Sequence, residues 1–280
     1  MDILHDPLRG CKYEETLLKV SDVSKTLGGK CILRDLDLEV KNLVRPGHTQ
    51  GQVVGLLGPS GMGKTTLFRL LAGLEPPDSG SVLVGQEQKP VLRGQVGVIA
   101  QNYPLFVHRT VLGNLLVAGH QAGLSGQKNL DEATALLERF GIAEHKDKYP
   151  AQLSGGQRQR VAIAQQFMCS EHFILMDEPF SGLDLLAEDR VIKFVSEIAE
   201  TDDLKTFILV THSVSAALKV CDMIWVLGRD RGGDGKPIPG ARLQQTFNLV
   251  ERNIAWRENV SETKEFHDAL REISALFPKL

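Results

Sequence analysis

Residues 58–65 combine glycines with a lysine and a threonine at a spacing that suits phosphate binding. In chain order they are Gly58, Pro59, Ser60, Gly61, Met62, Gly63, Lys64 and Thr65. Glycines let the backbone curl so that successive N–H groups face one anion, and the start of a following helix adds partial positive charge. We expect Lys64 to reach the β- and γ-phosphates of a nucleotide, the Thr65 hydroxyl to bind Mg²⁺, and Thr66 to contact the α-phosphate. An ordinary glycine turn is the alternative, but the full match to G-x-x-x-x-G-K-[ST] favours the phosphate site.

Two adjacent acidic residues follow an apolar run. Residues 173–176 (FILM) lead directly into Asp177 and Glu178, which places both carboxylates at the C-terminal end of a strand, where α/β sheets bind ligands. We expect Asp177 to hold the Mg²⁺ shell, and Glu178 to accept a proton from the attacking water or to polarise it. Most adjacent acid pairs are solvated surface charges, but the apolar run and the glycine loop upstream favour nucleotide hydrolysis here.

A second glycine-containing segment, residues 153–157 (LSGGQ), stands where a helix is predicted to begin. Ser154 supplies a hydroxyl, and Gly155 and Gly156 leave the backbone open. This pattern suits a second anion site, but it also suits a plain helix N-cap, and the residue types alone leave both interpretations open.

The elements that must position these residues follow from the spacing of apolar residues. Short continuous apolar runs, typical of buried strands, occupy residues 53–58, 96–100, 173–176, 206–211 and 223–227, and a further strand candidate lies at 81–84. Helical periodicity is found in residues 65–74, 110–120, 131–141, 157–168 and 263–277, the last of which we expect to pack on the core. Residues 17–23 and 31–40 alternate with period two around a turn at Gly28, which indicates antiparallel strands. The sequence therefore predicts an α/β core interrupted by a helical lobe.

The LSGGQ segment resembles the signature motif of ATP-binding cassette (ABC) ATPases, and it stands between the glycine loop and the acid pair as in that family. The resemblance implies an α/β fold with a P-loop RecA-like core, an antiparallel β subdomain and a helical signature subdomain. It predicts a leader at 1–16 and an ATPase domain at 17–227 that includes the helical subdomain at about 102–172. A C-terminal loop and helical tail should occupy 228–280.

The same resemblance implies how the site works. In the family, the signature of one subunit closes over the ATP held by the P-loop of another, so residues 154–156 should bind the nucleotide of a second cassette, in a homodimer. Gln101 resembles the glutamine that touches Mg²⁺ and water and senses the membrane partner. His212 resembles the histidine that contacts the γ-phosphate, and residues 181–184 resemble the D-loop at the dimer interface.

One position departs from the family pattern. Near residue 27 the family usually offers an aromatic side chain that stacks on adenine, whereas this chain has Leu27. Loss of a ring stack costs on the order of 1 kcal/mol, so we expect weaker discrimination among purine nucleotides rather than loss of binding. Tyr13 is the candidate that could supply a ring instead.

Composition and charge give no support to several other classes of protein. The 32 basic and 35 acidic residues give a formal charge of −3, so no nucleic-acid partner is indicated. No run approaches the roughly 20 apolar residues that cross a bilayer, and the N-terminus lacks a signal-peptide pattern, which predicts a cytoplasmic protein. The four cysteines form no CxxC pair, so they indicate neither a zinc site nor a redox motif.

The segment after Gln101 bears on the partner. Tyr103, Leu105, Phe106 and Val107 form an apolar patch that resembles the groove with which importer cassettes accept a permease. We therefore expect an ATPase subunit on the inner face of the cell membrane that energises import of a small solute, with transmembrane permease subunits and a solute-binding protein. A soluble non-transport ABC ATPase is the alternative. The LMDEP and FSGLD stretches and the short tail are similar to cassettes of the nitrate, sulfonate and taurine type.

Overall fold

The computed structural model describes residues 11–44, 51–99, 103–170, 173–181, 185–199 and 206–280. Its first sheet is antiparallel and consists of β2 (Lys30–Val44), β1 (Lys12–Leu27), β4 (Ser79–Val84) and the short β5 (Lys89–Pro90), in that order. The predicted turn between β1 and β2 is formed by Gly28 and Gly29, which adopt φ values of 56° and 75°. Glycine reaches this left-handed region without steric cost, so the hairpin can turn tightly there.

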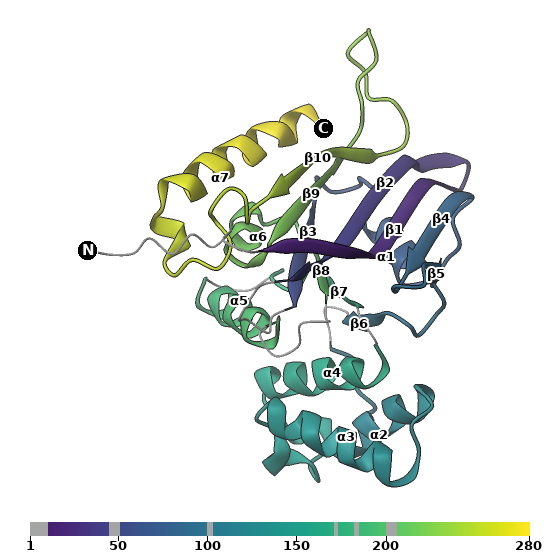
Figure 1. The fold of residues 1–280 in the computed structure, drawn as a ribbon, viewed down its shortest axis with the longest axis vertical. Helices are drawn as coiled ribbons and strands as arrows, with labels where there is room; N and C mark the ends of the chain where they lie inside the picture. The colour runs from purple at the N-terminus through teal and green to yellow at the C-terminus, as the bar shows by residue number, and fades with distance from the viewer. Residues whose placement is uncertain (1–10, 45–50, 100–102, 171–172, 182–184, 200–205) are drawn as a thin grey trace.

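The second sheet forms the centre of the molecule (Figure 1). Its order is β10 (Arg242–Asn248), β9 (Met223–Gly228), β3 (Gln52–Leu57), β8 (Thr206–Val210), β7 (Phe173–Asp177) and β6 (Gly97–Ile99). The five strands from β9 to β6 are parallel, and β10 joins the edge antiparallel to β9. Parallel strands end together at one edge of a sheet, so the loops after β3, β7 and β8 converge.

Helices pack around this sheet and also form a separate lobe. Those near the sheet are α1 (Lys64–Leu71), α5 (Leu185–Ala199), α6 (Val214–Val220) and α7 (Lys264–Leu276). The lobe consists of α2 (Val111–Gln121), α3 (Gly126–Arg139) and α4 (Gly155–Cys169), which lie together below the sheets in Figure 1. Within the described residues, short 3-10 helices cover Ala143–His145, Pro150–Gln152, Val260–Glu262 and Phe277–Lys279. None of the described helices combines the length and the apolar character that spanning a bilayer requires.

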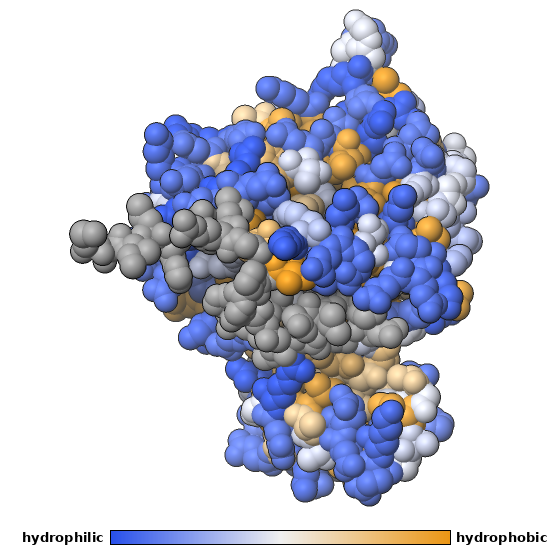
Figure 2. Space-filling view, viewed as in Figure 1, coloured by the Kyte–Doolittle hydropathy of each residue, from blue (hydrophilic) through white to orange (hydrophobic). Residues whose placement is uncertain are grey.

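The elements predicted from apolar residues form the core of the protein. Strands β3, β7 and β8 are buried on both faces, as continuous apolar runs predict. Helix α7 buries Phe266, Ala269 and Ile273 against the main core, which confirms the expected packing of its apolar face. On the face shown in Figure 2, hydrophilic residues dominate and hydrophobic ones are mostly scattered.

Strands β1 and β10 occupy residues that the sequence analysis assigned to the leader and to the C-terminal tail. Strand β1 begins at Lys12, within the predicted leader, because Lys12 and Tyr13 pair with Val44 and Leu43 although their side chains are exposed. Strand β10 lies within the predicted C-terminal loop and tail, where few apolar residues mark it. Both strand assignments rest on backbone pairing alone, and the periodicity of apolar residues does not reveal such pairing.

Candidate functional site

The glycine loop lies between β3 and α1. Gly63 caps the N-terminus of α1 with φ of 82°, and Gly61 also has a positive φ, of 79°. A Cβ atom at Gly63 would lie 2.8 Å from Cγ2 of Ile32, so strand β2 presses closely on the loop. Only glycine satisfies both the backbone conformation and the close contact.

Lys64 lies beneath this loop and is 8% exposed. Its ammonium donates hydrogen bonds to the carbonyl oxygens of Gly58, at 2.7 Å, and Pro59, at 3.1 Å. Burial lowers the pKa of Lys64, and the nearby carboxylates of Glu178 and Asp177 oppose that shift. The Lys64 ammonium thereby stabilises the conformation of the loop, and the same ammonium can contact phosphate oxygens.

A cavity of about 390 Å³ brings the glycine loop and the acid pair together. Its lining residues are Ile32, Ser60, Gly61, Gly63, Lys64, Thr65, Thr66, Asp177, Glu178 and Val210. Burial, followed by repulsion from Glu178, raises the pKa of Asp177, whereas Lys64 lowers it. The Lys64 ammonium and the carboxylates of Asp177 and Glu178 thus line one small cavity. Such an arrangement can bind a phosphate chain together with a divalent cation.

Glu178 is held in an unusual backbone conformation. Its φ is 48°, in the left-handed region that non-glycine residues seldom adopt. Its N–H donates to the Val210 carbonyl at 2.8 Å, and its own carbonyl accepts from the Ser181 N–H at 3.1 Å. Such strain tends to be retained where a side chain must be aimed at a functional site.

The side chain of Glu178 meets His212, which follows β8. Nδ1 of His212 lies 2.9 Å from Oε2 of Glu178, and the histidine is well exposed. Sequence order alone suggested these two residues separately, and the structure brings them into contact. Among the described residues, no group of three or more His, Cys, Asp or Glu side chains could hold a metal ion by itself.

The LSGGQ segment has a different setting. The Ser154 hydroxyl accepts a hydrogen bond from the Gln157 N–H at 3.3 Å, and the Gln157 side chain accepts from the Ser154 N–H at 2.9 Å. This reciprocal capping box starts α4. Gly155 and Gly156 are exposed, and a Cβ on either would meet nothing within 4 Å. These three residues do not line the cavity that holds Lys64.

Several predicted positions lie outside the described residues. They are Gln101 and the D-loop residues Gly182, Leu183 and Asp184. Ser181, the first residue of that loop, is described and lies three residues after Glu178.

The structure does not support Tyr13 as a substitute ring. Leu27 pairs with Lys30 beside the hairpin turn, whereas Tyr13 pairs with Leu43 at the other end of the same two strands. The 14 steps along the backbone from residue 13 to residue 27 correspond to up to about 46 Å of extended strand. The Tyr13 hydroxyl instead accepts a hydrogen bond from the side chain of Asn248 at 2.9 Å. The sequence suggested Tyr13 as the stacking ring because it does not show where along the strand this residue lies relative to the cavity.

Two lining residues were missed by sequence reasoning. Ile32 and Val210 line the cavity although neither belongs to a recognisable motif. Val210 is the last residue of β8, so the convergence of parallel strand ends could have identified it. Ile32 lies on β2 in the other sheet, and no signal in the sequence predicts that contact.

Comparison with known proteins gives a consistent result. The family model described as "ABC transporter" matches residues 44–181. Methionine import ATP-binding protein MetN 1 of Pseudomonas fluorescens is 34% identical over 265 residues, which cover 90% of this chain and 76% of the relative. The L-cystine transport system ATP-binding protein TcyN of Escherichia coli is 38% identical, and the match covers 73% of this chain and 84% of the relative. Sulfate/thiosulfate import ATP-binding protein CysA 2 of Rhizobium meliloti is 36% identical, and there the match covers 76% of this chain but 57% of the relative.

Solved structures share the fold. CbiO1 from Clostridium perfringens, described as part of the ABC transporter complex cbiONQ, has 25% identity and a TM-score of 0.70, with 95% of this chain and 97% of that chain covered. A second structure, the ATP-binding subunit of an ABC transporter, has 23% identity and a TM-score of 0.64. It covers 91% of this chain and 100% of that chain, and it shows the fold alone.

Proposed function

This chain belongs to the ATP-binding proteins of ABC transporters, and we propose that the ATP it binds and hydrolyses drives import of a small solute through a membrane permease. The single observation that carries the site assignment is the cavity in which Lys64 faces Asp177 and Glu178. Import is supported by the similarity to import ATP-binding proteins for methionine and for sulfate or thiosulfate, and transport of a small solute also by the similarity to an L-cystine transport system ATP-binding protein.

The phosphate chain of ATP lies, in this proposal, in the loop from Gly58 to Thr66. Backbone N–H groups of the glycine loop bind the phosphate oxygens, and Lys64 neutralises charge on the β- and γ-phosphates. The Thr65 hydroxyl and the Asp177 carboxylate are oxygen ligands of the kind Mg²⁺ prefers, and both line the cavity. Mg²⁺, when bound, would neutralise phosphate charge, and we infer that Gln101 is a further residue that would hold it.

Glu178 is the proposed base. Its carboxylate orients the attacking water or accepts a proton from it. The γ-phosphoryl group is transferred to that water, and ADP is the leaving group. His212 contacts the Glu178 carboxylate at 2.9 Å, and we propose that it also contacts the γ-phosphate. The strained backbone at Glu178 fixes the direction in which its side chain leaves the main chain. The carboxylate is therefore preorganised for the reaction.

A second copy of the chain completes the site. Ser154, Gly155 and Gly156 present a capped helix start to solvent rather than to the chain's own cavity. Open N–H groups at a helix start attract phosphate oxygens. We propose that these three residues close over the ATP held by the P-loop of a partner cassette in a homodimer.

The permease contact is assigned to the loop before α2. Phe106 and Val107 are exposed, Val107 to 72%, whereas Tyr103 and Leu105 of the predicted patch are partly buried and pack against the main core. Asn114, which is fully buried, bonds both the N–H and the carbonyl of Phe106 at 2.7 and 3.2 Å, so the loop is held in place. A fixed exposed apolar patch suits a partner helix. Through it the cassette would lie on the inner face of the membrane, with a solute-binding protein serving the permease. The narrower assignment to the nitrate, sulfonate and taurine group stays a prediction from the LMDEP and FSGLD stretches.

Copurification from native membranes tests this proposal. The tagged chain should retain permease subunits, and Phe106→Ala should lose them while the ATPase activity of the isolated chain changes little. Leu92→Ala is the matched control because Leu92 is also an exposed apolar residue, at 63% exposure, but lies outside this patch. Retention of ATPase activity by a chain that never associates with permease subunits would favour the soluble ABC ATPase instead.

A further inference from the structure

The segment that follows β9 lies against strand β2 of the first sheet. The Ala241 N–H donates to the carbonyl of Ile32 at 2.8 Å, and the Arg34 N–H donates to the carbonyl of Ala241 at 3.0 Å. Gly240, with φ of 87°, makes this approach possible, because a Cβ there would lie 2.6 Å from Cys31 Sγ. Residues 229–242, here called the return segment, are thus bonded to the strand that lines the nucleotide cavity.

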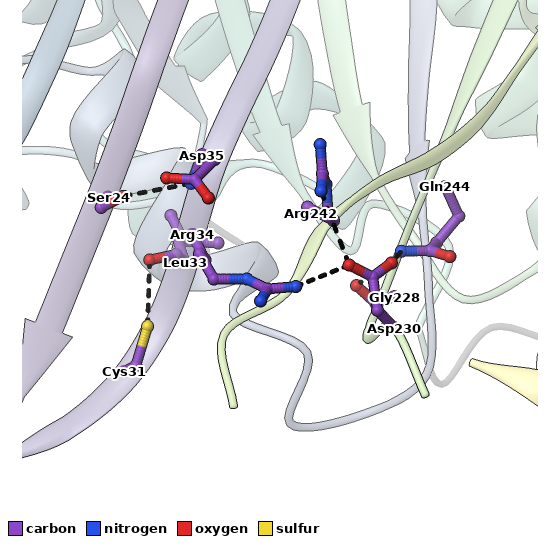
Figure 3. A network of polar contacts seen from close by, with 9 residues as sticks. All are labelled: Ser24, Cys31, Leu33, Arg34, Asp35, Gly228, Asp230, Arg242 and Gln244. Atoms are coloured by element: carbon purple, nitrogen blue, oxygen red, sulfur yellow. Dashed lines mark hydrogen bonds and ion pairs between the residues drawn. The ribbon is translucent and has the colours of Figure 1, made fainter. Parts of the chain in front are cut away.

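A carboxylate reinforces the connection (Figure 3). Asp230 pairs with Arg34 at 2.5 Å and with Arg242 at 3.6 Å, and its other oxygen accepts from the Gln244 amide at 3.0 Å. The hydrogen bond from Gln244 and the two arginines lower the pKa of Asp230. In Figure 3 the Arg34 side chain reaches from β2 toward Asp230, so one residue joins β2, the return segment and β10.

The same region touches the P-loop twice. Arg229, next to Asp230, places Nη2 3.4 Å from the carbonyl oxygen of Gly61, and its Nε is buried without a hydrogen-bond partner. Ile32, bonded to Ala241, packs against Gly63. Movement of the return segment must therefore shift the wall of the cavity, since packed interiors transmit displacement.

We propose that the return segment positions Ile32 for the nucleoside end of ATP, with Asp230 as the positioning residue. The inference rests on the proposed nucleotide site. Lys64, Asp177 and Glu178 are the charged lining residues and mark the phosphate end of the cavity. Ile32 is an apolar lining residue on a different sheet, five positions after Leu27, so it suits the less polar base and ribose. Position 27 is a leucine and offers no aromatic ring for stacking on the base. The placement of Ile32 should therefore influence base binding more than it would in a chain with such a ring.

Comparison of ATP with inorganic tripolyphosphate separates the two ends of the ligand. Tripolyphosphate carries the phosphate chain but lacks the nucleoside. We expect Asp230→Ala to weaken ATP binding by about tenfold, while tripolyphosphate affinity stays within about twofold of wild type. In steady-state hydrolysis the KM for ATP should rise with little change in kcat, because Glu178 is untouched. Asp230→Glu, which keeps the carboxylate, should recover most of the ATP affinity.

Asp234→Ala provides the matched control. Asp234 lies in the same segment, where its carboxylate pairs with the exposed Lys236 ammonium at 3.6 Å and accepts from the Lys236 N–H at 3.0 Å, so its loss should leave ATP affinity unchanged. Thermal unfolding of each variant checks that the fold is intact. Equal weakening of ATP and tripolyphosphate, or unchanged ATP affinity in Asp230→Ala, would overturn the inference. Failure of the wild-type chain to bind either ligand would instead contradict the proposed nucleotide site.

Discussion

The two glycine loops of this chain have similar composition but opposite surroundings. The P-loop between β3 and α1 is enclosed by β2, by the acid pair and by its own lysine, which is 8% exposed. The LSGGQ loop at the start of α4 is exposed, and added Cβ atoms on both its glycines would meet empty space. Gly58 and Gly63 of the first loop are required by contacts within the chain, whereas the two glycines of the second loop leave room for a group from outside it. The difference indicates which half of a composite site each loop supplies.

The largest effect should come from the catalytic end of the enclosed loop. Glu178→Gln keeps the shape of the side chain but removes the proposed base, so kcat should fall by about 10³-fold while ATP binding persists. ATP should then trap a dimer through the LSGGQ loop, detectable by size-exclusion chromatography. Glu188→Gln, on α5, is the control that should retain activity. Undiminished hydrolysis by Glu178→Gln would remove Glu178 from its proposed role.

Loss of the buried cation should act on binding instead. Lys64→Ala removes the ammonium that faces the phosphate chain, and we expect ATP affinity to fall by about 100-fold, or on the order of 3 kcal/mol. Titration calorimetry measures the dissociation constant directly. Lys193→Ala removes a well-exposed lysine and should leave it unchanged. An unaltered constant in Lys64→Ala would mean that the enclosed loop is not the phosphate site.

A pair of glycine substitutions compares the loops most directly. Gly63→Ala introduces strain at positive φ and a 2.8 Å contact with Ile32, so it should lower the free energy of unfolding by about 2 kcal/mol. Gly156→Ala replaces a helical glycine in open space and should raise it by up to about 1 kcal/mol. Urea unfolding measures both. Turnover should nevertheless slow in Gly156→Ala, because the methyl group faces the proposed partner; similar effects of the two variants on stability would contradict the comparison.

The smallest effect concerns the cap of α4. Ser154→Ala removes a hydroxyl that accepts from the Gln157 N–H, and loss of such a cap costs about 1 kcal/mol. Ser154→Asp should preserve that stability, since aspartate also caps helices, but its negative charge should repel ATP at the dimer interface. Urea unfolding combined with ATPase assays separates the capping role from the partner role. Full activity in Ser154→Asp would leave Ser154 with the capping role alone.

Local patterns carried most of the prediction. The P-loop, the acid pair and the capped start of α4 each depend on residues within about eight positions of one another, so spacing alone located them. Continuous apolar runs likewise located β3, β7 and β8, because strands covered on both faces need apolar residues at every position.

Contacts between distant segments were not predictable in this way. Ile32 reaches the cavity because β2 crosses the P-loop, and Tyr13 fails to reach it because the strand carries it to the opposite end. Strand β10 is recognised only by its pairing with β9, since its mostly polar and partly buried residues give little apolar periodicity. Each of these facts depends on the arrangement of two elements in space, which no single window of sequence contains.

The exposed LSGGQ loop has a consequence for assays of the purified chain. Under the proposed pairing, two identical half-sites face each other across a twofold axis, so both active sites assemble in one step. Specific activity should then rise with protein concentration and level off above the dissociation constant of the dimer. Dilute preparations would show little turnover even though every molecule is correctly folded and able to bind ATP.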